Sequence, residues 1–560
     1  MRADRPSGYR WIALSNTTLA MFMSTLDASI VIIAMPAIFR GIHMDPLASG
    51  NFGYLLWMIM GYMLVQAVLV ATLGRLGDMF GRVRIYNLGF VVFTIASLLL
   101  SFDPFTGEGG AQWLIGWRLL QALGGSMLTA NSVAILTDAF PEGQRGFALG
   151  INQISALLGQ FLGLVAGGVL AIFDWRAVFW VNVPVGIFGT VWAYVKLREI
   201  GQHQAGRIDW WGNVTFAFGL AALLIAITFG IHPYGRDAMG WRSPLTLSLL
   251  SAGIVLLVFF VLVERRSPEP MFDLSLLRER AFTAGVGAVL ASSVARGGLQ
   301  CMLVIWLQGV WLPLHGYRYE DTPLWAGIFL LPLSCGFILA GPLSGYLSDR
   351  VGARRLATSG MLVFAASLIG LMALPVDFPY WAFALCTLVS GIGSGMFAAP
   401  NTSAIMGSVP ASHRGVASGM RSTFQNSGNL LSIGTSFSLM IIVLAQVLPP
   451  SMIAGLTQQG VPEAIARQVA ALPPVASLFA AFLGVNPIEH VLAPSGIIAH
   501  LSAAHRATLT GTTFFPHLIA APFREGLLAV FGAATVLSLL AAWASFMRGQ
   551  ARVSSRRSVA

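Results

Sequence analysis

The sequence predicts an all-α integral membrane protein in which two related six-helix halves flank two inserted helices. Of its 560 residues, 56% are hydrophobic and only 10% are charged, whereas soluble domains have about 25% charged residues. The apolar residues gather in runs that reach the roughly 20 residues needed to cross a bilayer. In addition, short motifs recur at a near-constant spacing, which is typical of internal repeats.

We expect fourteen membrane-spanning helices. The first run continues past Asp27 without a small-residue cleavage site, so we interpret it as a retained helix rather than a signal peptide. The expected spans cover residues 11–37, 53–73, 85–101, 113–140, 147–173, 177–196, 211–231, 245–264, 282–310, 324–347, 356–374, 381–409, 415–447 and 523–547.

Two pairs of related segments divide the chain. Gly74–Arg84 (GRLGDMFGRVR) returns as Gly345–Arg355 (GYLSDRVGARR), and Pro141–Gly150 returns as Pro410–Gly419. Two six-span repeats are typical of secondary transporters, whose substrate site lies near the midplane between the halves. We therefore expect an N-terminal half at 1–200, an insertion with helices 7 and 8 and a cytoplasmic elbow at 201–280, and a C-terminal half at 281–560.

The basic residues favour one orientation. Placing both termini in the cytoplasm assigns 22 of the 33 Lys and Arg residues to the inside and seven to the loops of the opposite face, as the positive-inside rule requires. We expect a bacterial cytoplasmic (inner) membrane protein. The net charge of +10 then belongs to short loops and does not indicate nucleic-acid binding.

The connection at 448–522 is out of proportion to the others. Its sequence predicts short amphipathic helices on the outer face, and its apolar content argues against disorder. Two interpretations stay open: a packed outer cap, or a contact surface for an extracytoplasmic partner or a lipidic substrate.

Four groups of residues in or next to the expected spans carry a resemblance to a known family. They are Gly74, Leu76, Asp78, Gly81 and Arg82 after span 2, Leu26-Asp27 with Ala34-Met35-Pro36 in span 1, Arg118, Gln121 and Gly124 in span 4, and Trp175-Arg176 with Asn182, Pro184 and Gly186 in span 6. Outside 448–522, the chain resembles the major facilitator superfamily, specifically its fourteen-span drug:proton antiporter family. The resemblance implies the major facilitator fold and multidrug efflux.

The resemblance also implies an inner latch that holds the halves together. Carried onto this chain, Arg82 pairs with Asp138, and Asp78 faces a helix N-terminus of the other half. The alternative is a set of ordinary solvated loop charges. The expected latch residues are Gly74, Asp78, Gly81, Arg82, Asp138 and Asp349.

One departure concerns span 5. Leu164 stands where the family's antiporter motif has proline, so the kink expected from that proline is in doubt. The glycines of the motif keep their spacing and let helix backbones pack closely. These packing glycines are Gly159, Gly163, Gly167 and Gly168.

Ionisable residues inside spans are the candidates for proton coupling. Asp27 is the only acid that we place deep in the membrane, and Arg118 and Arg296 are its two candidate partners. Burial and a nearby arginine act in opposite directions on the proton affinity of a carboxylate, so a movable partner would couple protonation to conformation. The alternatives are a static ion pair or a counter-charge for the substrate.

Polar and aromatic residues in the spans are candidates for the substrate cavity. Arg421 either lines its inner mouth or extends to the headgroups. Three arginines against one aspartate favour neutral, amphipathic or weakly acidic substrates over dications. The candidates are Trp57, Gln66, Asn131, Gln153, Gln160, Gln300, Gln308, Arg421 and Gln425.

The leading function is a secondary active exporter of drugs or other amphipathic small molecules, driven by the proton gradient without a cofactor or metal, and working as a monomer in the bilayer. One alternative keeps the fold and exports a lipid, glycolipid or siderophore with the help of the outer loop. A membrane enzyme and a nucleotide-driven pump are disfavoured, because neither an HExxH metal site nor a GxxxxGK[ST] phosphate loop is present.

Overall fold

The computed structural model describes residues 8–45, 51–141, 144–200, 209–231, 234, 239–267, 270, 272–410, 414–484, 486–492 and 501–548. Side chains at 145–146, 349, 414–415 and 489–491 also lie outside the description. The regular elements are helices, and 14 of them are long and apolar enough to cross a membrane. The prediction of fourteen spans in an all-α membrane protein is therefore confirmed.

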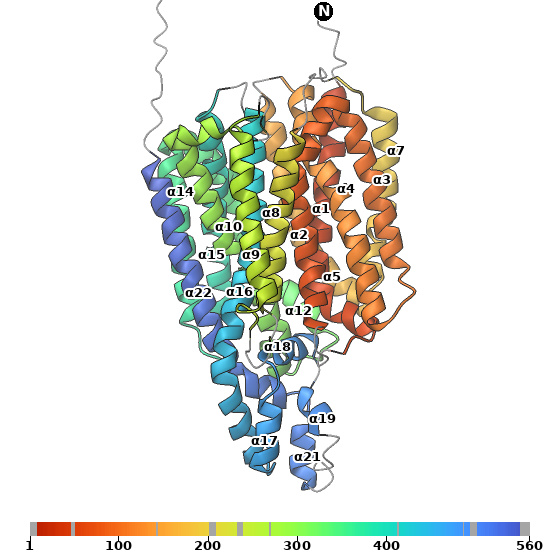
Figure 1. Cartoon of the computed structure of the whole chain (residues 1–560), viewed down its shortest axis with the longest axis vertical. Helices are drawn as coiled ribbons and strands as arrows, with labels where there is room; N and C mark the ends of the chain where they lie inside the picture. Colours follow the sequence, from red (N-terminus) through yellow and green to blue (C-terminus); the bar gives the residue numbers. More distant parts are fainter. Residues whose placement is uncertain are drawn as a thin grey trace, which may run out of the picture.

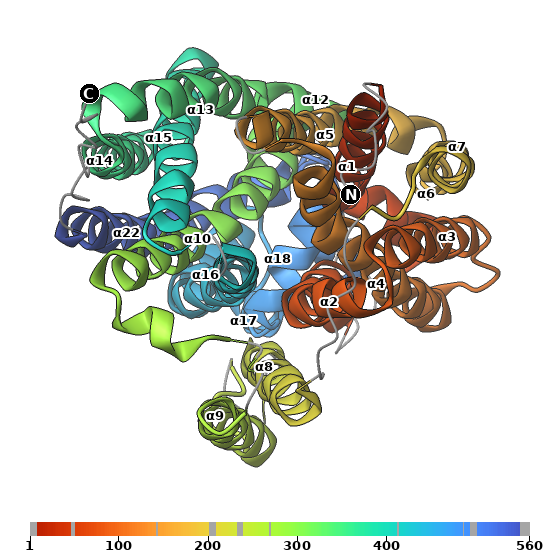
Figure 2. The same cartoon turned by 90° about the horizontal axis from the view of Figure 1, so that it is seen from above.

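The N-terminal half contains six spans that pack around α1 and α4 (Figures 1 and 2). Its last span is broken at Val181 into α6 and α7. The helices are α1 (Tyr9–Gly41), α2 (Asn51–Phe80), α3 (Arg82–Ser101), α4 (Gly107–Ala139), α5 (Arg145–Phe173), α6 (Ala177–Trp180) and α7 (Asn182–Lys196).

The two inserted helices pair with each other and lie to one side of both halves (Figure 2), where they contact α2 and α16. The C-terminal half then repeats the six-span arrangement. The inserted helices are α8 (Trp210–Ile231) and α9 (Pro244–Glu264), and the 3₁₀ helix η2 (Leu274–Arg278) follows them. The helices of the C-terminal half are α10 (Arg280–Trp306), the π-helical turn η3 (Leu307–Trp311), α11 (Leu312–Leu314), α12 (Thr322–Phe329), α13 (Leu331–Val351), α14 (Ala353–Met372), α15 (Tyr380–Gly407), α16 (Arg414–Gln458) and α22 (Phe514–Met547).

The repeated glycines at 81 and 352 have one physical role. Gly81 separates α2 from α3 with φ = 108°, and Gly352 separates α13 from α14 with φ = 95°. These values fall where side chains with a Cβ are strained, so glycine permits a one-residue turn between antiparallel spans. The repeated sequence thus corresponds to the same backbone conformation in both halves.

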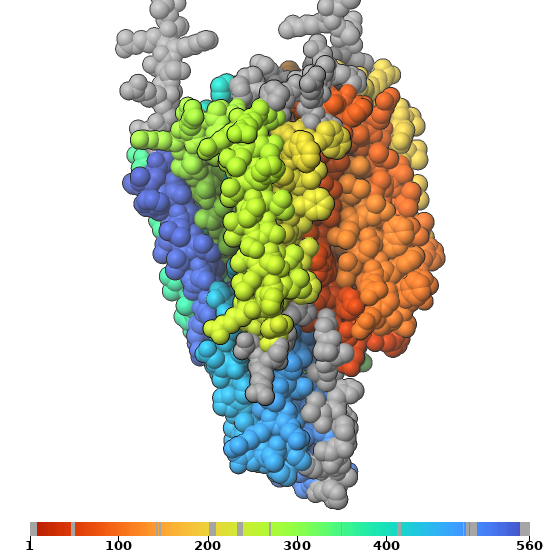
Figure 3. Space-filling view, in the orientation of Figure 1, coloured from red at the N-terminus to blue at the C-terminus, as the bar shows by residue number. Residues whose placement is uncertain are grey.

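Two helices are longer than predicted. Span 13 was expected to end at 447 and span 14 to begin at 523, but α16 continues to Gln458 and α22 already begins at Phe514. Hydropathy predicts the part of a helix that crosses the membrane. It does not predict where that helix ends once it extends beyond the membrane. The extensions carry the outer segment, which projects from the molecule (Figures 1 and 3).

The outer segment contains α17 (Glu463–Ala470), α18 (Pro474–Leu483), α19 (Pro487–Leu492) and α21 (Ala503–Leu509). The expectation of amphipathic helices fits α17, which buries one side only. It is wrong for α18, because all ten of its residues are buried. α18 contacts α1 and α2 of one half and α16 and η3 of the other.

The two halves meet at the outer end of the molecule. We call the face with Tyr9 and Arg548 the inner face and the opposite one the outer face (Figure 1). Phe52 of α2 lies edge-to-face on Phe437 of α16, with ring centroids 5.5 Å apart. Phe479 of α18 contacts Phe52 in the same way at 5.9 Å. These rings seal the outer side.

Toward the inner face, α5 and α16 have open space beside them. A Cβ placed on Gly150 of α5 or on Gly419 of α16 would meet no atom within 4 Å in the described part of the chain. Gln153 of α5 is exposed. Viewed from the inner face, α18 lies at the far end between the two halves (Figure 2). The halves are thus in contact at the outer face and are less closely packed beside the inner ends of α5 and α16.

Candidate functional site

The centre of the N-terminal half holds a buried ion pair. Asp27 of α1 is 0% exposed, and Arg118 of α4, whose Nη1 donates to Asp27 Oδ2, is 2% exposed. A charged pair this far from water is stable only when its remaining hydrogen-bonding atoms are also satisfied. Both carboxylate oxygens of Asp27 meet that condition, whereas the Nε of Arg118 is buried without a partner among the described residues.

Two amides complete the environment of Asp27. Asn182 at the start of α7 and Gln121 of α4 donate to Oδ1 at 2.7 Å and 2.9 Å. Arg118 also donates to Gln121 Oε1 at 2.6 Å. Its guanidinium lies 4.3 Å from the centroid of the Tyr62 ring, a cation–π contact. Residues of four helices, α1, α2, α4 and α7, thus form the Asp27–Arg118 pair and its surroundings.

Glycines of α5 let this helix lie directly on α1 beside Asp27. A Cβ on Gly163 would sit 2.6 Å from the carbonyl oxygen of Leu26, and Gly159 and Gly167 oppose Phe22 and Ile30 in the same manner. Gly168 faces the other way, onto the backbone of Leu324 in α12. Leu164 lies between these contacts and is 2% exposed.

Arg296 does not join Asp27 in this structure. It belongs to α10 in the other half, where its guanidinium lies 5.9 Å from the Phe337 ring centroid. The prediction of two arginine partners for Asp27 is therefore reduced to one, Arg118, in this conformation. The sequence identified Asp27 and Arg296 as charges inside spans but could not show that they face different neighbours.

The candidate cavity residues fall into two groups. Trp57, Gln66, Gln300, Arg421 and Gln425 are partly exposed, and Gln153 and Gln160 are exposed. Gln160 of α5 donates to Gln300 of α10 at 2.9 Å, a hydrogen bond between the halves. These side chains are accessible to a molecule between the halves.

The other two candidates are buried and structural, which corrects the prediction. Asn131 is 0% exposed and donates to the Met127 carbonyl at 2.9 Å, with a longer bond to Leu73 of α2. Gln308 is 0% exposed and donates to the Ile33 carbonyl at 3.1 Å across the outer contact of the halves. Both bridge helices and are buried in this arrangement, which the sequence pattern does not reveal.

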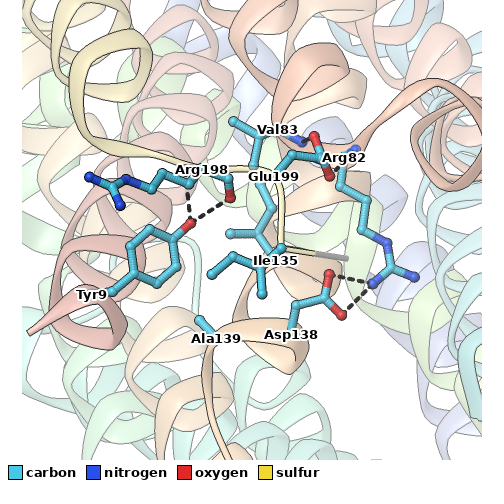
Figure 4. A pocket seen from close by; sticks show the side chains of 9 residues that line it. Tyr9, Arg82, Val83, Ile135, Asp138, Ala139, Arg198 and Glu199 are labelled. Carbon is cyan, nitrogen blue, oxygen red and sulfur yellow. Dashed lines mark hydrogen bonds and ion pairs between the residues drawn. The ribbon is translucent and has the colours of Figure 1, made fainter. Parts of the chain in front are cut away.

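The Arg82–Asp138 pair expected for the latch is formed within the N-terminal half (Figure 4). Arg82 donates from Nη1 to both oxygens of Asp138 at 2.6 Å and from Nε to Asp78 at 2.8 Å. Gly74 of α2 faces Ala130 of α4. The Asp349 side chain lies outside the described residues. In this arrangement the latch contacts described for Asp78 stay within its own half.

Sequence reasoning missed one member of this cluster. Glu199, in the segment after α7, accepts the backbone N–H groups of Arg82 and Val83, each at 3.0 Å, and so caps the first turn of α3 (Figure 4). A carboxylate is favourable at a helix N-terminus. No local pattern connects residues 117 positions apart. By contrast, Gln121 and Asn182 were detectable as polar residues in apolar spans.

The two six-span halves have the architecture of a multi-pass membrane transporter, and one half contains a buried charged site. The family model described as Major Facilitator Superfamily matches residues 17–209 and 205–433. The chain therefore belongs to the major facilitator superfamily, and its relatives include transporters of the drug-efflux type.

Three comparisons show the range of relatives. Multidrug resistance protein Stp of Mycobacterium tuberculosis is 30% identical over 88% of this chain and 85% of its own. The riboflavin transporter RibZ of Clostridioides difficile is 30% identical over 76% of this chain and 87% of its own. A bacterial homologue of the human lysosomal transporter Spinster, solved inward-facing and unoccupied, has a TM-score of 0.56 at 16% identity and covers 97% of this chain and 98% of its own; it shows the fold alone.

Proposed function

We propose that this transporter is a proton-coupled exporter of drugs or other amphipathic small molecules, located in the bacterial inner membrane with both termini in the cytoplasm. The observation that carries the proposal is the buried pair of Asp27 and Arg118. The drug-efflux relative supports export as the direction of transport.

The coupling follows from the cost of an unpaired buried charge. A proton that binds Asp27 removes the negative charge on which Arg118 depends. An uncompensated buried charge costs about 3–5 kcal/mol, so Arg118 then has to reach water or another acceptor. Either change moves α4 relative to α1, which links protonation to the arrangement of the halves.

The outer contacts define what has to break during the cycle. Export requires the substrate to leave on the outer face, so the rings of Phe52 and Phe437 separate there. α18 touches both halves, and opening therefore breaks its contacts with at least one of them. In this role α18 is an outer plug, held by its contacts with α1, α2, α16 and η3.

The proposal is tested by a toxicity screen with a deletion strain complemented by wild type or by Asp27→Asn. Wild type is expected to raise resistance to a subset of chemically diverse compounds, and Asp27→Asn is expected to lose this while reaching the membrane in equal amount. Resistance that is unchanged in Asp27→Asn would show that export does not depend on this carboxylate.

The same screen addresses the outer loop. Shortening the projecting part while keeping α18 leaves the seal intact. If small-molecule resistance survives the shortening, the projection is not needed for export. If only resistance to large lipidic compounds is lost, the loop acts in cargo handling.

A further inference from the structure

Two arginines in the C-terminal half have no acidic partner. Arg296 of α10 and Arg421 of α16 donate no hydrogen bond and form no ion pair with any residue that the structure describes, and their Nε atoms are buried without a partner. Buried charges in proteins are normally paired. The presence of two arginines without a described counter-charge inside a membrane protein therefore requires a physical explanation.

The sequence of this half excludes a hidden counter-ion along the spans that carry these arginines. α10 and α16 contain no Asp or Glu, and neither do α12, α14 and α15. The acids in the neighbouring helices are Asp349 at the inner end of α13, whose side chain lies outside the described residues, and Glu525 of α22, which is exposed. Among the side chains that the structure describes, no carboxylate neutralises either arginine.

The position of Gln300 shows which way Arg296 faces. Arg296 and Gln300 are four residues apart on α10 and share a helix face. Gln300 accepts a hydrogen bond from Gln160 of the opposite half. Arg296 therefore lies on the side of α10 that borders the space between the halves, one turn closer to the inner face.

Arg421 belongs to the same region. α10 packs against α16 through Gly297 and Gly298, which approach Asn429 and Ser432, and Arg421 lies eight residues before Asn429, about two helical turns toward the inner face. Both arginines are partly exposed, and their terminal nitrogens are not among the buried atoms that lack a partner. The guanidinium ends thus reach accessible space, while the stems are held by protein.

We infer that Arg296 and Arg421 form a binding site for the anionic group, a carboxylate, phosphate or sulfonate, of an amphipathic organic substrate. Guanidinium groups bind such anions through paired, charge-assisted hydrogen bonds. The substrate's apolar body would contact the ring of Phe337, and the amides of Gln160 and Gln300 are available to its polar groups. The inference rests on the proposed transport function and names its substrate class.

The test uses three ligands that share a pyrene body and differ in the head: pyrenebutyrate, pyrenebutanol and a pyrenebutyl-trimethylammonium salt. Binding to the full chain in phosphatidylcholine nanodiscs is measured by energy transfer from the protein's 15 Trp residues, with empty nanodiscs subtracted. The wild type is expected to bind the anion about tenfold more tightly than the alcohol, which corresponds to ~1.4 kcal/mol, and the cation most weakly.

Variants assign the preference to these two residues. Arg296→Gln/Arg421→Gln should bind the anion and the alcohol equally, whereas Arg421→Lys, which keeps the charge, should retain most of the preference. The control Arg355→Gln removes an exposed arginine and should behave as wild type. Equal binding of anion and alcohol by the wild type, or an undiminished preference in the double variant, would overturn the inference.

Lipid headgroups offer the same chemistry, so the measurement is repeated with phosphatidylglycerol in the nanodiscs. A substrate site keeps its preference for pyrenebutyrate, whereas loss of that preference would assign the site to lipid and overturn the inference. Because binding is measured without a gradient, this test fails or succeeds independently of proton coupling, which the Asp27→Asn screen addresses.

Discussion

Arg118 of α4 forms an ion pair with Asp27 of α1 in which the side chains are 2% and 0% exposed. The pair is surrounded by amides from α4 and α7 and by the ring of Tyr62. Its two charges depend on each other, because neither reaches water. This mutual dependence leads to the first prediction.

Arg118→Gln should destabilise the protein by about 3–5 kcal/mol, because it leaves Asp27 buried and uncompensated. Adding Asp27→Asn to this variant should restore part of the lost stability, since the double variant contains no unpaired charge at the site. Thermal unfolding in detergent measures both. A double variant less stable than Arg118→Gln alone would contradict the electrostatic account.

Gly163→Ala tests the close contact of α5 with α1. The added Cβ would lie 2.6 Å from the Leu26 carbonyl oxygen, next to Asp27, and overpacking of this kind costs about 1–3 kcal/mol. The matched control is Gly150→Ala in the same helix, where a Cβ meets nothing within 4 Å. Equal unfolding temperatures for the two variants would show that α5 does not hold α1 at this point.

Asp78→Ala tests the latch. The ion pair of Asp78 with Arg82 is 20–28% exposed, so it contributes at most about 1 kcal/mol to the stability of the arrangement described here. Its proposed role is in the opposite arrangement, where the inner face closes. We expect transport turnover to fall while substrate affinity and unfolding temperature stay near wild type. Turnover equal to wild type would remove Asp78 from the latch.

Bridging Phe52→Cys and Phe437→Cys with a short bifunctional thiol reagent should stop transport, because these positions join the halves on the outer face. Cleaving the bridge should restore it. The control pair Phe102→Cys and Trp180→Cys has rings 6.1 Å apart within the N-terminal half and should leave transport intact. Transport through the bridged Phe52–Phe437 variant would mean that the outer contact does not open.

The spans, the two halves and the charged candidates could be predicted because each leaves a local trace. Apolar runs mark membrane crossings, and Asp27 and Arg118 are conspicuous as charges inside them. Which face a polar residue presents depends on packing, and for that reason Asn131 and Gln308 were misassigned. The segment of α18 was expected to form an amphipathic helix, and its complete burial could not be predicted because it depends on contacts with both halves. The role of Glu199 could not be predicted, because it contacts a segment that is 117 positions away in the sequence.

The most direct test of the central claim is proton movement in proteoliposomes that contain a pH-sensitive dye and carry an imposed pH gradient. With a compound identified by the resistance screen, the wild type should dissipate the gradient when the compound is added. Asp27→Asn, folded and inserted to the same extent, should not. Dissipation by Asp27→Asn at the wild-type rate would contradict the assignment of proton coupling to Asp27.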